Sequence, residues 1–510
     1  MAAHSTILTK TMQKIPSWRK IISNDAGWLV GLSLAWLILL TLFSLLASTQ
    51  YGFHRDELAF LDNARHLDWG YVEYPPLTPF IARLSMAVFG VSLLGIRFIA
   101  SLAVSLAMLF TGLMVIDLGG SRQSQWIAAL GVGIAPIVLF NALYFSYQTF
   151  DYLWWVLAAY LLIHLIKSDD PRWWLAIGAV IGLGMMTKYT MGFFAAGIVA
   201  GVVFTPVRRF LKSPWLWAGA GLSLFIFLPN LIWQVQHHFI SLQFLTFIHA
   251  RDVSIGRTGA YLISQLYICT NVVMIVLWTR GLWYYWFHPQ GKRYRLLGWM
   301  FVIPFLLFLV LQGRYYYLSP AYPMLIAAGT MLVTRPRRGL YQGMLVGALA
   351  AMALTLPIAP VNSGWWKVAI STSGELREEV GWPELVGTVA GIRDSLPVEE
   401  RSQAGILATN YGEAAAIDLF GAQYNLPQAI SGIDTYWLRG YGNHPPQTLI
   451  VLGMSQNEAL AIFESCTLAG HPSNRYGIAN EEVTQHPDIF VCRKMRQPWA
   501  EFWKTFHYFG

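Results

Sequence analysis

Residues 27–48 read GWLVGLSLAWLILLTLFSLLAS, and this stretch contains no charged side chain. A helix needs about 20 mainly apolar residues to cross the hydrocarbon core of a bilayer. The stretch is longer than the apolar region of a cleaved signal peptide, which has about 7–15 residues. It follows a basic N-terminus with Lys10, Lys14, Arg19 and Lys20. The stretch therefore predicts a retained first membrane span.

Ten further apolar stretches have the length of a span or nearly so. They cover residues 92–117, 125–146, 152–167, 173–187, 190–206, 215–233, 259–279, 295–311, 317–333 and 340–358. The composition agrees, because 55% of the 510 residues are hydrophobic and only 12% are charged. A soluble domain carries about 25% charged residues. The sequence therefore predicts an all-α polytopic membrane protein with about eleven transmembrane helices.

Basic residues gather in the connectors on one side of these predicted spans. The clusters are the N-terminus, Arg122, Lys167 with Arg172, Arg208 to Lys212, Arg280 to Arg295 and Arg335 to Arg338. Because connectors rich in Lys and Arg stay in the cytoplasm, we expect the N-terminus to be cytoplasmic. We expect a multi-pass protein of the bacterial cytoplasmic (inner) membrane whose C-terminal part lies in the periplasm. The net charge of +8 forms no continuous basic groove, so no nucleic-acid binding is expected.

The chain changes character at about residue 362. Short apolar stretches at 405–409, 448–452 and 489–492 alternate with helical patterns at 382–396, 413–423 and 457–466. Strands interleaved with helices indicate a small α/β domain. We therefore predict a transmembrane domain at 1–361 and a soluble domain at 362–510. No glycine-rich phosphate loop and no metal-ligand spacing occurs, so neither a cofactor nor a metal is expected. Cys466 and Cys492 form a disulfide or remain two thiols.

Two of the outward loops are long. The first, residues 49–91, predicts a short helix at 55–67 and an amphipathic helix at 77–90, separated by Pro75-Pro76. Amphipathic helices of this kind lie in the membrane interface. The second, residues 234–257, carries His237, His238, Arg251 and Arg257.

Acidic residues on the outward side are candidates for chemistry, because ionisable groups near membrane depth are costly and usually functional. Asp56 and Glu57 directly follow the first span, where they could act as a general base and its orienting partner. Alternatively, both carboxylates only stabilise the start of the short helix. Asp151 opens the fourth span, where it either caps the helix or binds a partner.

Outward cations are the second set of candidates. Lys188 lies in the tight turn between the fifth and sixth spans, and Arg314 precedes the tyrosines of 315–317. Each could bind a phosphate. The alternatives are a lysine that reaches lipid headgroups and an arginine that stacks on a ring. Tyr74 lies in the Pro-Pro turn and Tyr316 beside Arg314. Acids, cations and aromatic rings on one face suit a lipid-linked phosphate substrate whose sugar stacks on the rings.

The order of these motifs resembles bacterial glycosyltransferase family 39, which includes protein O-mannosyltransferases and the aminoarabinose transferases that modify lipid A. The motifs are His54-Arg55-Asp56-Glu57, Trp69-Gly70-Tyr71, Tyr74-Pro75-Pro76-Leu77, Asp151, Thr187-Lys188, Leu228-Pro229-Asn230-Leu231-Ile232-Trp233, Tyr315-Tyr316-Tyr317, Tyr322-Pro323 and Asn410-Tyr411-Gly412-Glu413. The resemblance covers nearly the whole chain. It implies a GT-C fold, with interfacial helices in the first outer loop and a soluble domain at the end.

The resemblance also implies an activity. Such enzymes transfer a sugar, with inversion, from a polyprenyl-phosphate donor to an envelope glycolipid, glycan or protein outside the cytoplasmic membrane. It assigns the catalytic carboxylate to Asp56, with Glu57 beside it. The aminoarabinose transferases have a lysine where this chain has Tyr74 and an arginine where it has Ala59, so Arg55, Lys188 and Arg314 are the expected phosphate ligands. A transporter or flippase of a lipid-linked sugar is the alternative, but charged groups gather on one side and do not follow a path through the spans.

Overall fold

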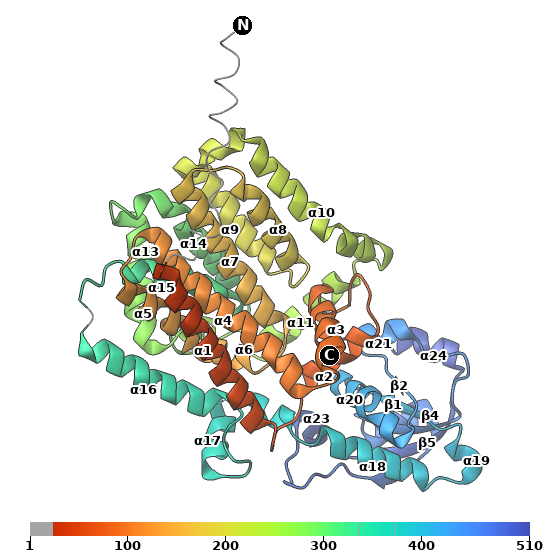
Figure 1. The fold of residues 1–510 in the computed structure, drawn as a ribbon. Helices are drawn as coiled ribbons and strands as arrows, with labels where there is room; N and C mark the ends of the chain where they lie inside the picture. The colour runs from red at the N-terminus through yellow and green to blue at the C-terminus, as the bar shows by residue number, and fades with distance from the viewer. Residues whose placement is uncertain (1–23, 336, 373) are drawn as a thin grey trace.

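The computed structural model describes residues 24–335, 337–372 and 374–510, and Figure 1 shows its helical bundle with a smaller α/β domain at one end. The bundle consists of α1 (Asn24–Ala47), α4 (Leu93–Leu118), α5 (Arg122–Gly133), α6 (Pro136–Ala142), α7 (Tyr147–Ser168), α8 (Trp173–Met185), α9 (Met191–Phe204), α10 (Pro214–Gln236), α12 (Tyr261–Tyr267), α13 (Ile275–Phe287), α14 (Arg295–Val310), α15 (Tyr322–Thr330) and α16 (Arg338–Thr355). Each of the eleven predicted spans contains at least one of these helices.

Five helical segments of the described chain are long and apolar enough to cross a membrane. They contain α1, α4, α7, α10 and α14, and three pairs of helices joined at a bend raise the number to eight. The count of eleven spans therefore stays a prediction. The difference arises because several predicted spans form short or broken helices.

Two broken spans lie against each other. α5 and α6 meet at a bend of 68°, and the segment that contains α12 and α13 bends by 92°. The backbone N–H of Ile137 donates to Ile268 O at 3.1 Å, and Asn271 Nδ2 donates to Ile134 O at 3.2 Å. Backbone groups freed by a helix break need partners at membrane depth. Here each break provides partners for the other.

Three helices lie outside the predicted spans on the side of the α/β domain. α2 (Arg55–Arg65) and α3 (Leu77–Phe89) confirm the two helices predicted in the first outer loop, within two residues. The second outer loop also contains a helix, α11 (Ile240–Ser254), which the sequence does not predict. Its apolar residues Leu242, Leu245 and Phe247 are exposed.

The C-terminal part contains a five-stranded sheet with the order β2-β1-β3-β5-β4. The strands are β1 (Gly405–Ala408), β2 (Ala429–Ile430), β3 (Thr448–Leu452), β4 (Phe463–Gly470) and β5 (Ile489–Met495). β1 runs parallel to β2 and β3, whereas β5 is antiparallel to β3 and β4. The sheet and its helices confirm the predicted α/β character of this region.

Helices α18 (Trp382–Asp394), α20 (Tyr411–Phe420), α22 (Gln456–Ile462) and α24 (Trp499–Thr505) pack on this sheet. The predicted helix at 457–466 was wrong beyond Ile462, because the chain enters β4 at Phe463. Cys466 and Cys492 face each other across β4 and β5 and form a disulfide.

Polar contacts fasten the α/β domain to α2. Asp62 accepts a hydrogen bond from Tyr436 at 2.7 Å and pairs with Arg439. Arg55 pairs with Glu481 at 2.8 Å and with Glu482 at 2.7 Å. The helix that carries Asp56 is therefore held from both sides, by the bundle and by the α/β domain.

Candidate active site

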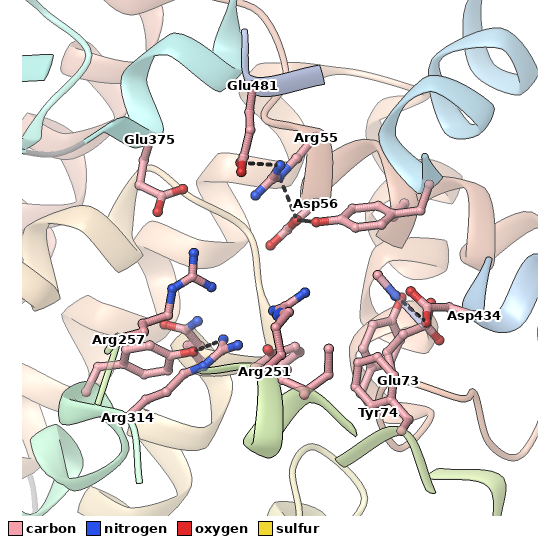
Figure 2. Close-up of a pocket in the computed structure, with 18 of the residues that line it drawn as sticks. Arg55, Asp56, Glu73, Tyr74, Arg251, Arg257, Arg314, Glu375, Asp434 and Glu481 are labelled. Carbon is pink, nitrogen blue, oxygen red and sulfur yellow. Dashed lines mark hydrogen bonds and ion pairs between the residues drawn. The ribbon is translucent and has the colours of Figure 1, made fainter. Parts of the chain in front are cut away.

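A cavity of about 1900 Å³ opens where the bundle, the outer loops and the α/β domain meet. Side chains from α2, α7, α11, the 3₁₀ helix Tyr315–Ala321 and the α/β domain line it. Figure 2 shows Arg257 and Arg314 on one side of this pocket and Glu73, Tyr74 and Asp434 on the other, with Asp56 and Arg251 between them. Of the predicted site residues, Arg55, Asp56, Tyr74, Lys188, Arg314 and Tyr316 line the cavity.

Asp56 is held between two phenols. Tyr144 donates a hydrogen bond to Oδ2, and Tyr411 of α20 donates one to Oδ1 at 2.7 Å. Burial acts to raise the pKa of Asp56, but His54, Arg55 and the hydrogen bonds from Tyr144 and Tyr411 lower it below its ordinary value. About a third of the side chain, 34%, remains exposed. Asp56 is thus an ionised, oriented carboxylate that faces the cavity.

The residues before Asp56 fix the start of its helix. His54 Nδ1 accepts the backbone N–H of Asp56 at 3.1 Å, which caps α2. Nε2 lies 3.0 Å from Glu375 Oε2, to which it donates. His54 therefore fixes the orientation of Asp56 through the backbone. Its own side chain does not line the described cavity.

Glu57 does not line the described cavity. It is fully buried and pairs with Arg97 of α4 at 2.8 Å. It also accepts the backbone N–H groups of His54 and Phe145, each at 2.9 Å. Every oxygen of this carboxylate has a partner. Its position fits the orienting role expected for Glu57, because these contacts fix α2 against the bundle.

Three arginines converge on one buried aspartate. Asp252 of α11 is 3% exposed and lies 3.4 Å from Arg251, 3.6 Å from Arg257 and in an ion pair with Arg314. Arg314 also donates to Tyr316 Oη at 2.9 Å. One carboxylate cannot neutralise three guanidinium groups, so this wall of the cavity keeps excess positive charge. Guanidinium groups bind phosphate through paired hydrogen bonds.

Lys188 adds a fourth cation. Its ammonium group lies 4.7 Å from the ring centre of Tyr147, 5.1 Å from that of Tyr316 and 4.2 Å from that of Tyr317. Rings at this distance attract a cation through their faces. The side chain lines the cavity and is therefore turned inward.

Asp151 lies behind this wall and not in it. It is buried and accepts hydrogen bonds from Trp155 at 3.0 Å and from Thr190 at 2.8 Å. Thr190 lines the cavity, so Asp151 holds the turn that carries Lys188. Direct contact with a substrate, as predicted from the sequence, remains a prediction.

The opposite wall is acidic. Tyr74 accepts a hydrogen bond from Asn63 at 2.6 Å and packs against Phe60. Beside it, burial raises the pKa of Glu73 above its ordinary value. Burial and the neighbouring Glu73 do the same to the pKa of Asp434. These carboxyl groups are thus protonated more readily than Asp56. Opposite pKa shifts of neighbouring acids are typical of active sites.

Sequence reasoning did not select four of these residues as site residues: Tyr144, Arg251, Arg257 and Tyr411. Arg251 and Arg257 lie close to Asp252 in the sequence, but only the fold brings Arg314 to the same carboxylate and places the three arginines at the cavity. Tyr411 belongs to a motif of the family resemblance, yet its distance of 355 positions from Asp56 gave no sign of contact. No group of at least three His, Cys, Asp or Glu side chains suited to a metal ion occurs among the described residues.

Known proteins share parts of this chain and its fold. Residues 73–233 match the family model of dolichyl-phosphate-mannose-protein mannosyltransferases. The chain is 24% identical to the lipid A galacturonosyltransferase RgtD of Rhizobium johnstonii over 272 residues, which cover 51% of this chain and 55% of that protein. The crystal structure of apo ArnT from Cupriavidus metallidurans matches with a TM-score of 0.56 at 15% identity, over 92% of this chain and 98% of ArnT. The chain has the GT-C fold, and its resemblance to the GT-C glycosyltransferases is confirmed.

A second crystal structure of the same ArnT, bound to undecaprenyl phosphate, matches with a TM-score of 0.54 at 15% identity, over 91% of this chain and 98% of ArnT. At this identity the likeness establishes the fold. The match to RgtD spans about half the length of that relative.

Proposed function

We propose that the chain transfers a sugar from a polyprenyl-phosphate donor to an acceptor at the outer face of the cytoplasmic membrane, with inversion at the anomeric carbon. The observation that carries this proposal is the shared cavity, in which the ionised Asp56 faces a wall of arginines. Two relatives add support. RgtD is named for a sugar transfer to lipid A, and ArnT binds undecaprenyl phosphate.

In this proposal the basic wall holds the donor phosphate. Arg251, Arg257 and Arg314 share one buried carboxylate, Asp252, so an anion would balance them, and Lys188 lies nearby over the ring of Tyr317. A polyprenyl-phosphate sugar carries one negative charge, and transfer leaves a phosphate monoester with more. Cations at this place therefore stabilise the transition state more than the bound donor.

Asp56 then acts on the acceptor. The acceptor hydroxyl oxygen attacks the anomeric carbon, and its proton passes to Asp56. The bond between that carbon and the phosphate oxygen breaks, and its electron pair stays on the phosphate. A single displacement of this kind inverts the configuration. The two phenols keep Asp56 ionised and fix its direction, which is what a general base requires before the reaction.

The proposed acceptor is an envelope glycolipid, glycan or protein on the outer side, and the proposed topology has a cytoplasmic N-terminus and a periplasmic α/β domain. The N-terminal basic cluster lies outside the described residues. Reporter fusions after Arg338 and at the C-terminus should give opposite answers, and equal answers would contradict this topology.

Mass spectrometry of envelope lipids and glycans tests the proposed reaction. Cells that produce the wild-type chain should contain a species heavier by one sugar residue. Cells with Asp56→Asn at equal membrane abundance should lack it, because the isosteric amide cannot accept the proton. The variant Asp68→Asn is the matched control, since Asp68 accepts a hydrogen bond from Trp233 and does not line the described cavity. An identical set of species with Asp56→Asn would contradict the proposal.

A further inference from the structure

The α/β domain has its own potential binding crevice. β1 lies between β2 and β3, and both neighbours run parallel to it. Residues Ile406 and Ala408 of β1 share a core with α20, whereas Leu407 shares one with Ala459 of α22. The helices that follow β1 and β3 thus cover opposite faces of the sheet. In open α/β sheets, ligands bind between the carboxyl ends of two such strands.

This crevice opens into the cavity that contains Asp56. Thr409 and Asn410 follow β1, Gly453 and Met454 follow β3, and all four line the cavity. Gly453 has φ +75°, and a Cβ atom there would collide with Thr409 Oγ1 and lie 2.7 Å from Glu413 Oε2. Only glycine therefore lets the loop after β3 pass so close to Thr409 and Glu413.

Behind Gly453 lies a carboxyl oxygen of Glu413 that has no hydrogen-bond partner among the described residues. Glu413 of α20 is 2% exposed. Burial and the nearby Glu482 raise the pKa of Glu413 to about 8. An unpaired buried polar atom costs free energy, so a polar ligand group or a water held by it would stabilise this site.

The crevice adjoins the catalytic carboxylate directly. Tyr411, the residue after Asn410, donates its hydroxyl hydrogen bond to Asp56 Oδ1 at 2.7 Å. Gly412 permits this approach, because a Cβ atom there would lie 3.0 Å from Arg55 Cβ and 2.9 Å from Trp382. A ligand between Asn410 and Gly453 would therefore lie beside the group that takes the proton.

We propose that the crevice between the carboxyl ends of β1 and β3 binds the sugar headgroup of the acceptor and presents its hydroxyl to Asp56. This inference rests on the proposed transferase function. The chemistry favours a sugar, because Asn410, Tyr411 and Tyr508 line the crevice and the Glu413 carboxyl lies directly behind Gly453. Such groups bind hydroxyls by hydrogen bonds and the ring face by packing.

The basic wall would thus bind the donor, and the crevice would bind the acceptor. The crevice residues that line the described cavity on the loops after β1 and β3 include no cation. A phosphate is better held by Arg257 and Arg314 across the cavity. The donor headgroup and the acceptor sugar would meet at Asp56 from different elements of the fold.

The test measures binding of two probes to the full-length protein in nanodiscs. The first probe is an array of bacterial envelope oligosaccharides with a parallel peptide array, and the second is undecaprenyl phosphate. Asn410→Ser keeps the cap of α20, where Asn410 accepts the N–H of Gly412, but removes the amide. Glu413→Gln replaces the unpaired oxygen at constant size. Asn480→Ser is the control, since Asn480 caps α23 (Glu481–Gln485) in the same way and does not line the described cavity.

We expect the wild-type protein and Asn480→Ser to bind the same oligosaccharides. Asn410→Ser and Glu413→Gln should bind them about tenfold more weakly and should bind undecaprenyl phosphate as the wild type does. Unchanged oligosaccharide binding in both variants would overturn the inference, and so would wild-type binding to peptides alone or to neither array. Failure of the transferase proposal is distinguishable, because cells with the wild-type chain would then lack the envelope species heavier by one sugar residue.

Discussion

Two arginine clusters near Asp56 have opposite charge balances. Behind α2, Arg97 pairs with Glu57 at 2.8 Å and with Glu379 at 3.1 Å, and all three side chains are at most 3% exposed. Burial raises the pKa of Glu379 to about 7, although Arg97 opposes this shift. One cation and two carboxyl groups, one of them readily protonated, leave little net charge.

Across the cavity the cations outnumber the carboxylates. Arg251, Arg257 and Arg314 share Asp252, and their side chains are 34%, 48% and 18% exposed. The first cluster is closed to the cavity and nearly balanced in charge, which is the arrangement of a structural ion pair. The second is open and carries excess charge, which is the arrangement of a binding site. Ion pairs of similar length thus serve different purposes, and the surplus charge distinguishes them.

The largest effect is expected in the closed cluster. Glu57→Gln leaves Arg97 buried with an incomplete partner, and breaking a buried pair costs about 3–5 kcal/mol. The free energy of unfolding in detergent should fall by this amount, measured by thermal or chemical unfolding. Glu464→Gln is the control, because the Glu464 side chain is 55% exposed. Normal stability with complete loss of transfer would mean that Glu57 reacts and does not merely orient.

A smaller effect is expected in the open cluster. Arg257→Gln and Arg314→Gln each remove a charged hydrogen-bond donor from the phosphate, worth about 1.5–3 kcal/mol. Affinity for undecaprenyl phosphate should therefore fall by roughly 10- to 100-fold while the protein stays folded. The exposed Arg83 of α3 provides the control Arg83→Gln. Equal affinity in all three variants would show that the surplus charge has another purpose.

The smallest effect concerns Tyr411, which donates a hydrogen bond to Asp56. Its hydrogen bond lowers the pKa of Asp56, so Tyr411→Phe should raise it. Transfer requires ionised Asp56 and is lost as the pH falls through this pKa, so the acidic limb of kcat/KM should move to higher pH. Activity should recover in part as the pH rises.

The other groups that face Asp56 are His54, Arg55, Tyr144, Tyr147 and Glu375, and Tyr411→Phe leaves them in place. Tyr424→Phe, a change at a partly exposed tyrosine of the same domain, is the control. An unchanged pH profile in Tyr411→Phe would mean that Tyr411 has only a packing role.

The sequence predicted features that depend on local patterns. Apolar length located the helices of the bundle, and short apolar stretches located β1, β3 and β5 within a few residues. Asp56 was selected from its place after the first span and from the family resemblance. The cavity confirms that it lies with Lys188 and Arg314, but their roles remain predictions.

Contacts between distant segments could not be predicted in this way. Periodicity carries no information about Tyr411 reaching Asp56 or about Arg314 reaching Asp252, because tertiary packing alone decides these pairs. Adjacent positions also do not show which of Asp56 and Glu57 faces the cavity. Neighbours on a helix point in different directions, and here one meets the cavity and the other meets Arg97.

The most direct test of the account is the rate of sugar transfer by the purified protein in vesicles that contain a polyprenyl-phosphate sugar donor. Asp56→Asn should reduce the rate by about a hundredfold or more and leave undecaprenyl phosphate binding unchanged, whereas Asp68→Asn should stay close to the wild type. Transfer by Asp56→Asn at the wild-type rate would contradict the central claim that Asp56 is the catalytic base.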